Sequence, residues 1–290
     1  MGLSDGRVVI VTGAGQGIGR AHALAFAADG ARVVVNDVGD AADETAALVR
    51  EAGGEAVVSR GDVSDWGYGE QLVRTAVESF GALDALVNNA GLVRDRMLTN
   101  MSEDEWDLVL KVDLKGHFVP LRHAAAYWRE QSKAGAPRAA RVVNTSSGAG
   151  LLGSVGQGNY AAAKAGVVAL TQVAAAEMGR FGVVLNAIAP AARTPMTEVV
   201  FAQTMAKPES GFDPMDPANV SPLVVWLASA ECTTTGRVFE VEAGVISVAD
   251  GWQHGPREDR GDRWPVEEVG PAVEKLLAQA PAPAPVYGSG

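Results

Sequence analysis

The chain has 290 residues, of which 47% are hydrophobic and 20% are charged, and this balance excludes a disordered chain. Its formal net charge of −11 excludes a general electrostatic attraction to nucleic acid or to an anionic membrane. The single cysteine, Cys232, excludes an intrachain disulfide, and the four histidines lack the spacing of metal ligands, so no metal site is expected.

The N-terminal stretch MGLSDGRVVIVTG lacks a basic region followed by an apolar core and a cleavage site. No run of about 18 apolar residues occurs in the chain. We therefore expect a cytoplasmic protein with no membrane partner.

Short Val-rich runs alternate with helical patterns up to Pro190. Strands are predicted at Val8–Thr12, Arg32–Asn36, Ala56–Arg60, Ala85–Asn88, Arg141–Thr145 and Val183–Ala189. Helices are predicted from the Gly-rich turn to about Asp29, at Asp43–Ala52, at Glu70–Phe80, from a capping box at Ser102 and Glu105 towards Ser132, and at Tyr160–Met178. Buried strands separated by helices predict an α/β fold, with a single Rossmann-type doubly wound parallel sheet and helices on both faces.

The pattern changes in the last third of the chain. Residues 191–215 predict a long loop with one short helix, which is followed by a helix at Ser221–Ala230 and a last strand at Val238–Val241. From residue 251 a C-terminal extension is expected, with a helix at Val266–Ala280 and a Pro/Ala tail whose final ten residues are predicted to be mobile. This extension could cover a neighbouring subunit or the pocket.

The stretch TGAGQGIG joins the first strand to the first helix. Gly13, Gly17 and Gly19 allow the backbone to turn sharply and to approach a pyrophosphate at the N-terminus of the helix. A tight turn without a ligand is the alternative.

Asp37 closes the second predicted strand, 18 residues beyond Gly19. A carboxylate there can accept hydrogen bonds from an adenosine ribose and repels a 2′-phosphate. Gln16 adds no positive charge, and no Arg or Lys is adjacent to Asp37 in the sequence, so NAD is favoured over NADP. The alternative is a turn-forming carboxylate before Gly39. Asp62 could hold the adenine amino group or could cap a helix.

The stretch QGNYAAAK places Tyr160 and Lys164 one helical turn apart. An ammonium beside a phenol lowers the pKa of the phenol, which would make Tyr160 a candidate general base. A solvated helix face is the alternative interpretation of such a pair.

Together with NNAG (Asn88–Gly91) and with Ser147, which precedes Tyr160 by thirteen residues, these motifs resemble the classical short-chain dehydrogenase/reductase family. The resemblance covers residues 5 to 250 approximately, so residues 1–250 are expected to form one NAD-binding domain and residues 251–290 an extension. It implies an enzyme that transfers a hydride between a nicotinamide and a carbinol carbon.

In this family the residues matching Tyr160, Lys164 and Ser147 respectively exchange the substrate proton, hold the nicotinamide ribose and bind the substrate oxygen. Ser146 is a rival to Ser147, but the spacing favours Ser147. The resemblance implies cofactor contacts at Gly13, Gln16, Gly17, Ile18, Gly19, Asp37, Asp62, Val63, Asn89, Ala90, Gly91, Tyr160, Lys164, Pro190 and Thr194.

The chain departs from the family pattern at two places. Asp113, in KVDLKGHF, stands where the family usually has an asparagine that holds a water of a proton relay, so we add Asp113 to the catalytic set. Its charge would partly offset the effect of Lys164 on Tyr160. In APAART, Ala191 replaces a common glycine, and the segment up to Met196 is one residue shorter than usual.

Longer stretches resemble one branch of the family, the 3-hydroxyacyl-CoA dehydrogenase unit of the peroxisomal multifunctional β-oxidation enzyme, which is also described as a 17β-hydroxysteroid dehydrogenase. The stretches are VVVNDVGD, NNAGLVRDRML, EDEWDLVLKVDLKGHF, ANVSPLVVWLASAEC and FEVEAGVI. This resemblance implies NAD-dependent oxidation of a bulky secondary alcohol, either a 3-hydroxyacyl-CoA thioester or a hydroxysteroid-like molecule. Arg94 and Arg96 are candidates for CoA phosphates. Apolar candidates for substrate contact are Leu151, Leu152, Met196, Val199, Met205 and Trp252.

Two alternatives remain open at this point. One is an NADPH-dependent 3-oxoacyl-carrier-protein reductase, against which Asp37 and Gln16 argue. The other is a catalytically silent NAD-binding subunit used in assembly. In either case the resemblance implies a homodimer or homotetramer that is built on helices Trp106–Ala125 and Tyr160–Met178.

Overall fold

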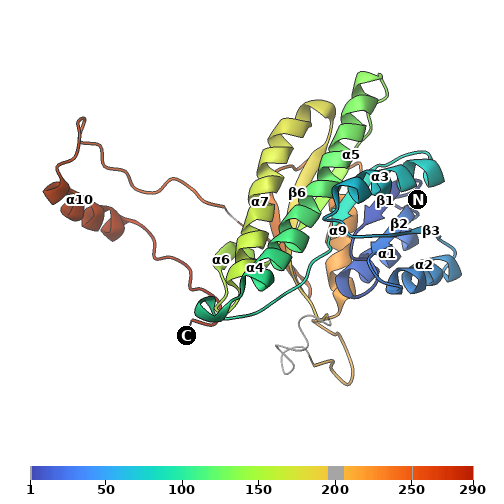
Figure 1. Cartoon of the computed structure of the whole chain (residues 1–290), viewed down its shortest axis with the longest axis horizontal. Coiled ribbons are helices and arrows are strands. Elements are labelled where there is room, and N and C mark those ends of the chain that lie inside the picture. The colour runs from blue at the N-terminus through green and yellow to red at the C-terminus, as the bar shows by residue number, and fades with distance from the viewer. Residues whose placement is uncertain (1, 195–205, 250, 290) are drawn as a thin grey trace.

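The computed structural model describes residues 2–194, 206–249 and 251–289, in which one eight-stranded sheet is flanked by helices (Figure 1). The strand order is β3-β2-β1-β4-β5-β6-β7-β8. The strands are β1 (Val8–Val11), β2 (Arg32–Asp37), β3 (Glu55–Arg60), β4 (Ala85–Asn88), β5 (Arg141–Thr145), β6 (Val184–Ala191), β7 (Val238–Glu242) and β8 (Val245–Ala249). The first seven strands run parallel, in the doubly wound Rossmann-type arrangement predicted from the sequence.

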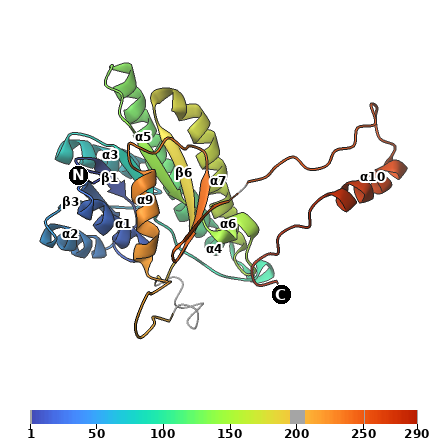
Figure 2. The same cartoon turned by 180° about the vertical axis from the view of Figure 1, so that it is seen from behind.

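The central strands are buried on both faces, which explains why they are apolar without alternation. All four residues of β1 and all four of β4 are buried. One apolar cluster on the sheet includes side chains of α1, α2 and α9, and a second includes side chains of α3, α5 and α7. Figure 2 shows these two helical layers from behind. The sheet is therefore a rigid support whose strand ends are fixed in register.

The helices largely follow the predicted pattern. They are α1 (Gly17–Ala28), α2 (Ala41–Glu51), α3 (Trp66–Phe80), η1 (Leu98–Asn100), α4 (Glu103–Val109), η2 (Leu110–Lys115), α5 (Gly116–Lys133), α6 (Gly148–Leu152), α7 (Gly158–Met178), η3 (Gly179–Phe181), η4 (Pro217–Val220), α9 (Ser221–Leu227) and α10 (Val266–Gln279). The capping box of Ser102 and Glu105 is present at the start of α4.

Three helical predictions need correction, and one helix was not predicted. The helix after β3 begins at Trp66 rather than Glu70, because Asp65 accepts a hydrogen bond from the Tyr68 amide and caps α3 there. The helix that follows β4 is interrupted by the π-helical segment η2. The short helix α6 was not predicted, and α9 ends at Leu227, before Ala230.

The strand predicted at Val238–Val241 is present as β7, but it is not the last one, since β8 follows it and pairs with it in the antiparallel direction. The reversal takes place at Ala243, which has a φ of 51°, and at Gly244. Strand β8 is exposed at nearly every position, so it has no buried face to impose an alternating apolar pattern. This explains why periodicity did not reveal it.

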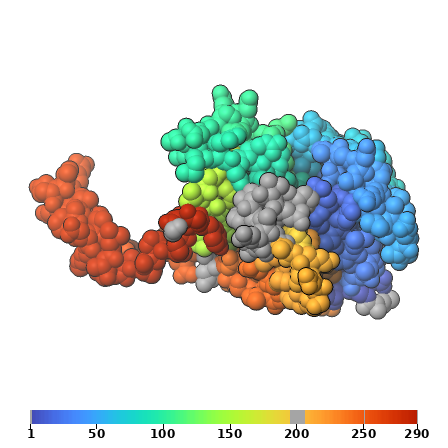
Figure 3. Space-filling view, turned by 90° about the horizontal axis from the view of Figure 1, so that it is seen from below, coloured from blue at the N-terminus to red at the C-terminus, as the bar shows by residue number. Residues whose placement is uncertain are grey.

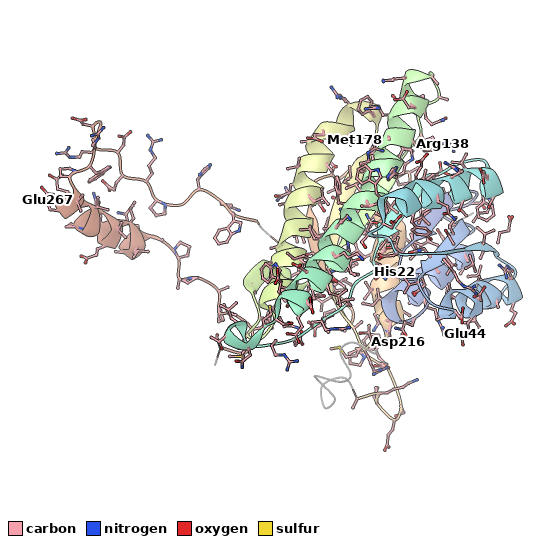
Figure 4. All side chains as sticks on the ribbon, viewed as in Figure 1. His22, Glu44, Arg138, Met178, Asp216 and Glu267 are labelled. Carbon is pink, nitrogen blue, oxygen red and sulfur yellow. The ribbon has the colours of Figure 1, made fainter. Side chains whose placement is uncertain are left out.

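The C-terminal extension forms an arm that leaves the body after β8 and returns to it near α6 (Figure 1). Helix α10 has no buried residue, and Figure 4 shows its labelled Glu267 well apart from the body. The end of the arm contacts the body, because Ser154 and Tyr287 form a parallel β-bridge. The mobility of the final ten residues stays a prediction.

Candidate active site

The sequence motifs converge on the carboxyl edge of the sheet. The glycine loop follows β1, the segment Asn89–Gly91 follows β4, and Ser147 follows β5. Because these strands are parallel neighbours, their carboxyl ends meet at one edge, where doubly wound folds bind their ligands. This edge is therefore the candidate active site.

The glycine loop has the backbone that close approach to a dinucleotide requires. Gly13 and Gly17 have φ angles of 62° and 54°, which favour glycine over other residues. A Cβ at Gly13 would come within 2.7 Å of the Ala90 Cα, and one at Gly19 would overlap the Gly13 carbonyl oxygen. The Gln16 side chain does not cap α1, which begins at Gly17 and includes Ile18. The residues present therefore fit a pyrophosphate at the N-terminus of α1.

Asn89 and Ala90 are hydrogen-bonded to the start of the glycine loop. The Thr12 Oγ1 accepts hydrogen bonds from the Asn89 and Ala90 amides at 2.9 and 3.1 Å. The Asn89 Nδ2 donates to the Thr12 and Gly13 carbonyl oxygens at 3.0 and 3.3 Å. Both motifs thus form one wall beside the cofactor site.

Asp37 lies at the end of β2 and reaches the same loop. One carboxylate oxygen accepts from the Gly15 amide at 3.0 Å, and the other accepts from the Gly39 amide at 3.2 Å. The second bond is the turn-forming contact that the sequence left open as an alternative. A carboxylate accepts more than one hydrogen bond per oxygen, so Asp37 keeps capacity for ribose hydroxyls.

Sequence reasoning missed a cation beside Asp37. Arg60 is the direct partner of Asp37 in the β2–β3 register, although it is 23 residues away in the sequence. Its guanidinium pairs with Asp43 and lies 3.4 Å from Asp40. Two carboxylates therefore pair with this cation, and with Asp37 on the neighbouring strand the local charge remains negative. Strand pairing was the signal that could have revealed this neighbour.

Asp62 and Val63 follow β3. The Asp62 carboxylate accepts from the amide and hydroxyl of Ser64 at 2.9 and 2.6 Å and lies 3.3 Å from the Lys111 Nζ. These contacts hold the pKa of Asp62 below its usual value, despite the opposing effect of burial. Val63 is buried. Asp62 does not cap α3, because Asp65 does.

Tyr160 and Lys164 lie on one face of α7, as their spacing predicted. The Lys164 Nζ is 5.6 Å from the centre of the Tyr160 ring, and it donates a hydrogen bond of 3.0 Å to the Thr145 carbonyl oxygen. Only 2% of the Lys164 side chain is exposed. This pair is not a solvated helix face.

The pKa of Tyr160 is raised above its ordinary value, contrary to the expected lowering. Burial of the phenol is the largest cause and outweighs the opposite effect of Lys164, while the Asp113 carboxylate adds a smaller upward effect. A hydrogen bond from Ser147 favours the phenolate. The sequence indicated the neighbouring charge correctly but could not weigh the burial.

Asp113 lies inside the π-helical segment η2 and is fully buried. One carboxylate oxygen accepts from the Leu92 amide at 2.9 Å, and the other lies 3.3 Å from the Lys164 Nζ. Burial raises the pKa of Asp113, and Lys164 opposes that rise. Gly91 allows this approach, because a Cβ there would come within 2.7 Å of the Asp113 carboxylate.

The two serines after β5 have different surroundings. Ser146 is buried and donates its hydroxyl to the Lys164 carbonyl oxygen at 2.8 Å. Ser147 is partly exposed, caps α6 by accepting from the Ala149 amide at 3.2 Å, and lies close enough to Tyr160 to lower the pKa of the phenol. Of the two hydroxyls, that of Ser147 is thus the one placed beside the phenol.

Asn159 is a positioning residue that the sequence did not reveal. It is fully buried, its Oδ1 accepts from the Tyr160 amide at 2.8 Å, and its Nδ2 donates to the Arg94 and Glu105 carbonyl oxygens at 3.0 and 3.2 Å. It therefore ties the start of α7 to α4 and to the segment before it. A polar residue immediately before Tyr160 was the available signal.

The remaining predicted positions are less defined. Pro190 lies in β6 opposite Val241, and Thr194 is the last described residue before residues 195–205. Met196, Val199 and Met205 lie outside the described residues. Trp252 is fully exposed at the start of the arm, and the fold brings Leu151 and Leu152 next to Ser147, in α6.

Two further features, a membrane-spanning helix and a metal site, are absent from the described part of the chain. Within it, no helix combines the length and the apolarity needed to cross a membrane. Across the same residues, no group of three or more His, Cys, Asp or Glu side chains could hold a metal ion.

Comparisons with known proteins agree with this geometry. The chain is 50% identical over 246 residues to hydroxyacyl-CoA dehydrogenase ChsB1 of Mycobacterium tuberculosis, covering 82% of this chain and 77% of the relative. It is 42% identical over 252 residues to the mouse peroxisomal multifunctional enzyme type 2, covering 83% of this chain but only 32% of that longer protein. These relatives are the ones expected of the predicted branch.

A crystal structure of a short chain dehydrogenase from Mycobacterium avium is 61% identical in sequence, with a TM-score of 0.92 over 99% of this chain and all of that one. The family model for short chain dehydrogenases matches residues 7–204. Proteins of this family use a nicotinamide dinucleotide to oxidise or reduce a carbinol or carbonyl carbon. The chain belongs to the short-chain dehydrogenase family.

Proposed function

We propose that the protein oxidises a secondary alcohol of the 3-hydroxyacyl-CoA or hydroxysteroid-like class to the ketone, with NAD as hydride acceptor and Tyr160 as general base. The observation that carries this proposal is the cluster of Tyr160, Lys164 and Ser147, with buried Asp113, at the strand ends beside the glycine loop. The names of the hydroxyacyl-CoA dehydrogenase and multifunctional relatives support the substrate class.

The cofactor is held in the proposal by the glycine loop, by Asp37 and by the segment Asn89–Gly91. When bound, a nicotinamide supplies the C4 carbon that exchanges the hydride. The carboxylates around Arg60 favour NAD, since they neutralise the cation that a 2′-phosphate would need.

The chain's own groups handle the proton. The Tyr160 Oη takes the hydroxyl proton of the substrate, and the Ser147 Oγ hydrogen-bonds to the same oxygen as its charge changes. Lys164 holds the nicotinamide ribose and stabilises the phenolate. Asp113 and the Thr145 carbonyl oxygen fix the position of the Lys164 ammonium.

The CoA portion of a thioester would meet the exposed side of the 94–96 segment. The Arg96 guanidinium already pairs with Glu105 at 2.9 Å, whereas Arg94 is exposed and forms no ion pair with any described residue. Arg94 is thus the better candidate for a phosphate contact.

We further propose a homodimer or homotetramer built on α4, α5 and α7. Partly exposed Trp106, Phe118 and Val173 on these helices support such an interface. The cytoplasm is kept as the proposed location, which is consistent with a buried, free thiol at Cys232.

The decisive experiment measures NADH and NADPH formation with 3-hydroxyacyl-CoA esters, hydroxysteroids and small secondary alcohols. Oxidation of the bulky substrates with NAD is expected. A clear preference for NADP would instead favour the 3-oxoacyl-carrier-protein reductase. Tight NAD binding without turnover of any substrate would favour the silent assembly subunit.

A further inference from the structure

The last residues of the chain lie against the segment that follows Ser147. The Val155 amide donates a hydrogen bond of 2.9 Å to the Tyr287 carbonyl oxygen, and the Tyr287 amide donates one of 3.3 Å to Gly153. Figure 3 shows the dark red C-terminal tail against the yellow-green surface of this part of the chain. The tail is thus placed by backbone pairing, as an added strand would be.

Two glycines make room for the tail. A Cβ at Gly148 would come within 3.1 Å of the Tyr287 Oη and 3.2 Å of its ring, and a Cβ at Gly153 would come within 3.3 Å of the Val286 side chain. Gly148 directly follows Ser147, and Gly153 ends α6. The Tyr287 ring therefore lies against the residue that directly follows Ser147 in the chain.

Apolar side chains gather around the same edge of the site. Met97 lies opposite Gly156 and Leu98 opposite Gly158, at 4.0 and 3.8 Å from the Cβ positions of those glycines. This places residues 97–98 beside the segment that carries the tail. The large apolar residues that are exposed here are Met97, Leu98, Leu152, Val155, Val286 and Tyr287. Such an exposed group of apolar side chains, next to reactive groups, is typical of a ligand-binding surface.

We propose that the C-terminal tail forms one wall of the substrate site and that the Tyr287 ring is a specificity-determining contact for the apolar group beside the reacting carbon. This inference rests on the proposed function. The apolar group is the acyl chain of a thioester or the ring system of a hydroxysteroid, since both would bury surface against an aromatic ring.

Tyr287 acts on substrate selection and not on the proton transfer. Its backbone, not its hydroxyl, holds the tail in place, so replacing the side chain leaves the two hydrogen bonds to Gly153 and Val155 intact. About half of its surface, 48%, is exposed and can be covered by a ligand. A short substrate that ends near Ser147 would not reach this ring.

The test compares the wild type with Tyr287→Ala and Tyr287→Phe. KM and kcat are measured with NAD for 3-hydroxyacyl-CoA esters of increasing chain length and, in parallel, for hydroxysteroids. Tyr287→Ala is expected to raise KM about tenfold for the longest or bulkiest substrates, with little change for the shortest ester. Tyr287→Phe keeps the ring and should resemble the wild type.

A second measurement needs no turnover. The Kd of a saturated long-chain acyl-CoA, which has no hydroxyl to oxidise, is measured by calorimetry and should rise about tenfold in Tyr287→Ala. Leu277→Ala is the matched control, because it removes an apolar side chain from the same arm at a position far from the tail contact. Its KM and Kd should equal those of the wild type.

The outcomes separate the two proposals. Normal turnover with equal KM and Kd in wild type and Tyr287→Ala would overturn the proposed role of the tail and leave the proposed function in place. The same holds if Tyr287→Ala raises KM equally for short and long substrates, or if Tyr287→Phe raises KM as much as Tyr287→Ala does. If the wild type oxidises none of the bulky substrates and does not bind the saturated ester, the proposed substrate class is wrong. The proposed role of the tail is then wrong as well. If only hydroxysteroids are turned over, and Tyr287→Ala raises their KM, the tail contacts the ring system of the substrate.

Discussion

Two regions of the molecule are held by different contacts: residues 8–191, whose strand ends form the candidate active site, and the arm of residues 251–289, whose end lies against the segment after Ser147. In the first region, loop residues such as Asn89 are hydrogen-bonded to neighbouring strand ends within a buried sheet. In the second region, α10 buries no residue, and the end of the arm is held to the body by the pairing of Tyr287 with the segment Gly153–Val155. The first region can therefore fix reacting groups to within a fraction of an ångström, while the second can change contacts with a substrate at little cost to folding.

The largest effect on kcat is expected from a change in the Tyr160–Lys164 pair of α7. Tyr160→Phe removes the hydroxyl that is proposed to exchange the substrate proton, so kcat should fall about 10²–10⁴-fold. NAD affinity should be nearly unchanged, because the ring and Lys164 remain. Steady-state kinetics together with a NAD titration measure both quantities. Full turnover by the Phe variant would remove Tyr160 from its proposed role.

A smaller effect is expected at the cofactor end of the first region. Asp37→Ser removes a charged acceptor that would hold the ribose and removes the repulsion of a 2′-phosphate, so the ratio of kcat/KM for NAD to that for NADP should fall about 10–100-fold. The control is Asp43→Asn, which weakens the ion pair of Arg60 but leaves Asp37 in place. It should change the ratio of kcat/KM for the two cofactors less than Asp37→Ser does. Equal ratios in Asp37→Ser and the wild type would show that Asp37 does not select the cofactor.

These two variants test residues that were identified from the sequence, and the reason they could be identified is physical. The glycine loop, Asp37 and the Tyr160–Lys164 pair depend on a strand, a turn or a single helical turn, all of which leave a local pattern. The parallel sheet followed from buried Val-rich runs for the same reason. Strand β8, the register neighbour Arg60 and the raised pKa of Tyr160 depend on pairing and burial between distant segments, and no local pattern encodes them.

Asp113→Asn tests the balance of charges that the sequence could not weigh. The Asp113 carboxylate raises the pKa of Tyr160, so a neutral amide should lower that pKa. Oxidation needs the deprotonated phenol, and its rate rises as the pH approaches the pKa from below. The rising limb of log kcat/KM should therefore move to lower pH, while most of the activity is kept. A limb that stays in place or moves to higher pH would contradict the proposed influence of Asp113.

The smallest effect is expected in the arm. Leu277→Ala should change the free energy of unfolding by less than about 0.5 kcal/mol, because this side chain is 67% exposed and α10 packs on no part of the body. The matched change in the sheet, Leu86→Ala, removes a fully buried side chain of β4 and should cost about 2–5 kcal/mol. Urea unfolding monitored by circular dichroism measures both values. A cost above about 1 kcal/mol for Leu277→Ala that depends on protein concentration would contradict a free-standing α10 and would indicate that it packs on a second copy of the chain. In that case the tail that carries Tyr287 would be held by the oligomer, and substrate selection would depend on assembly.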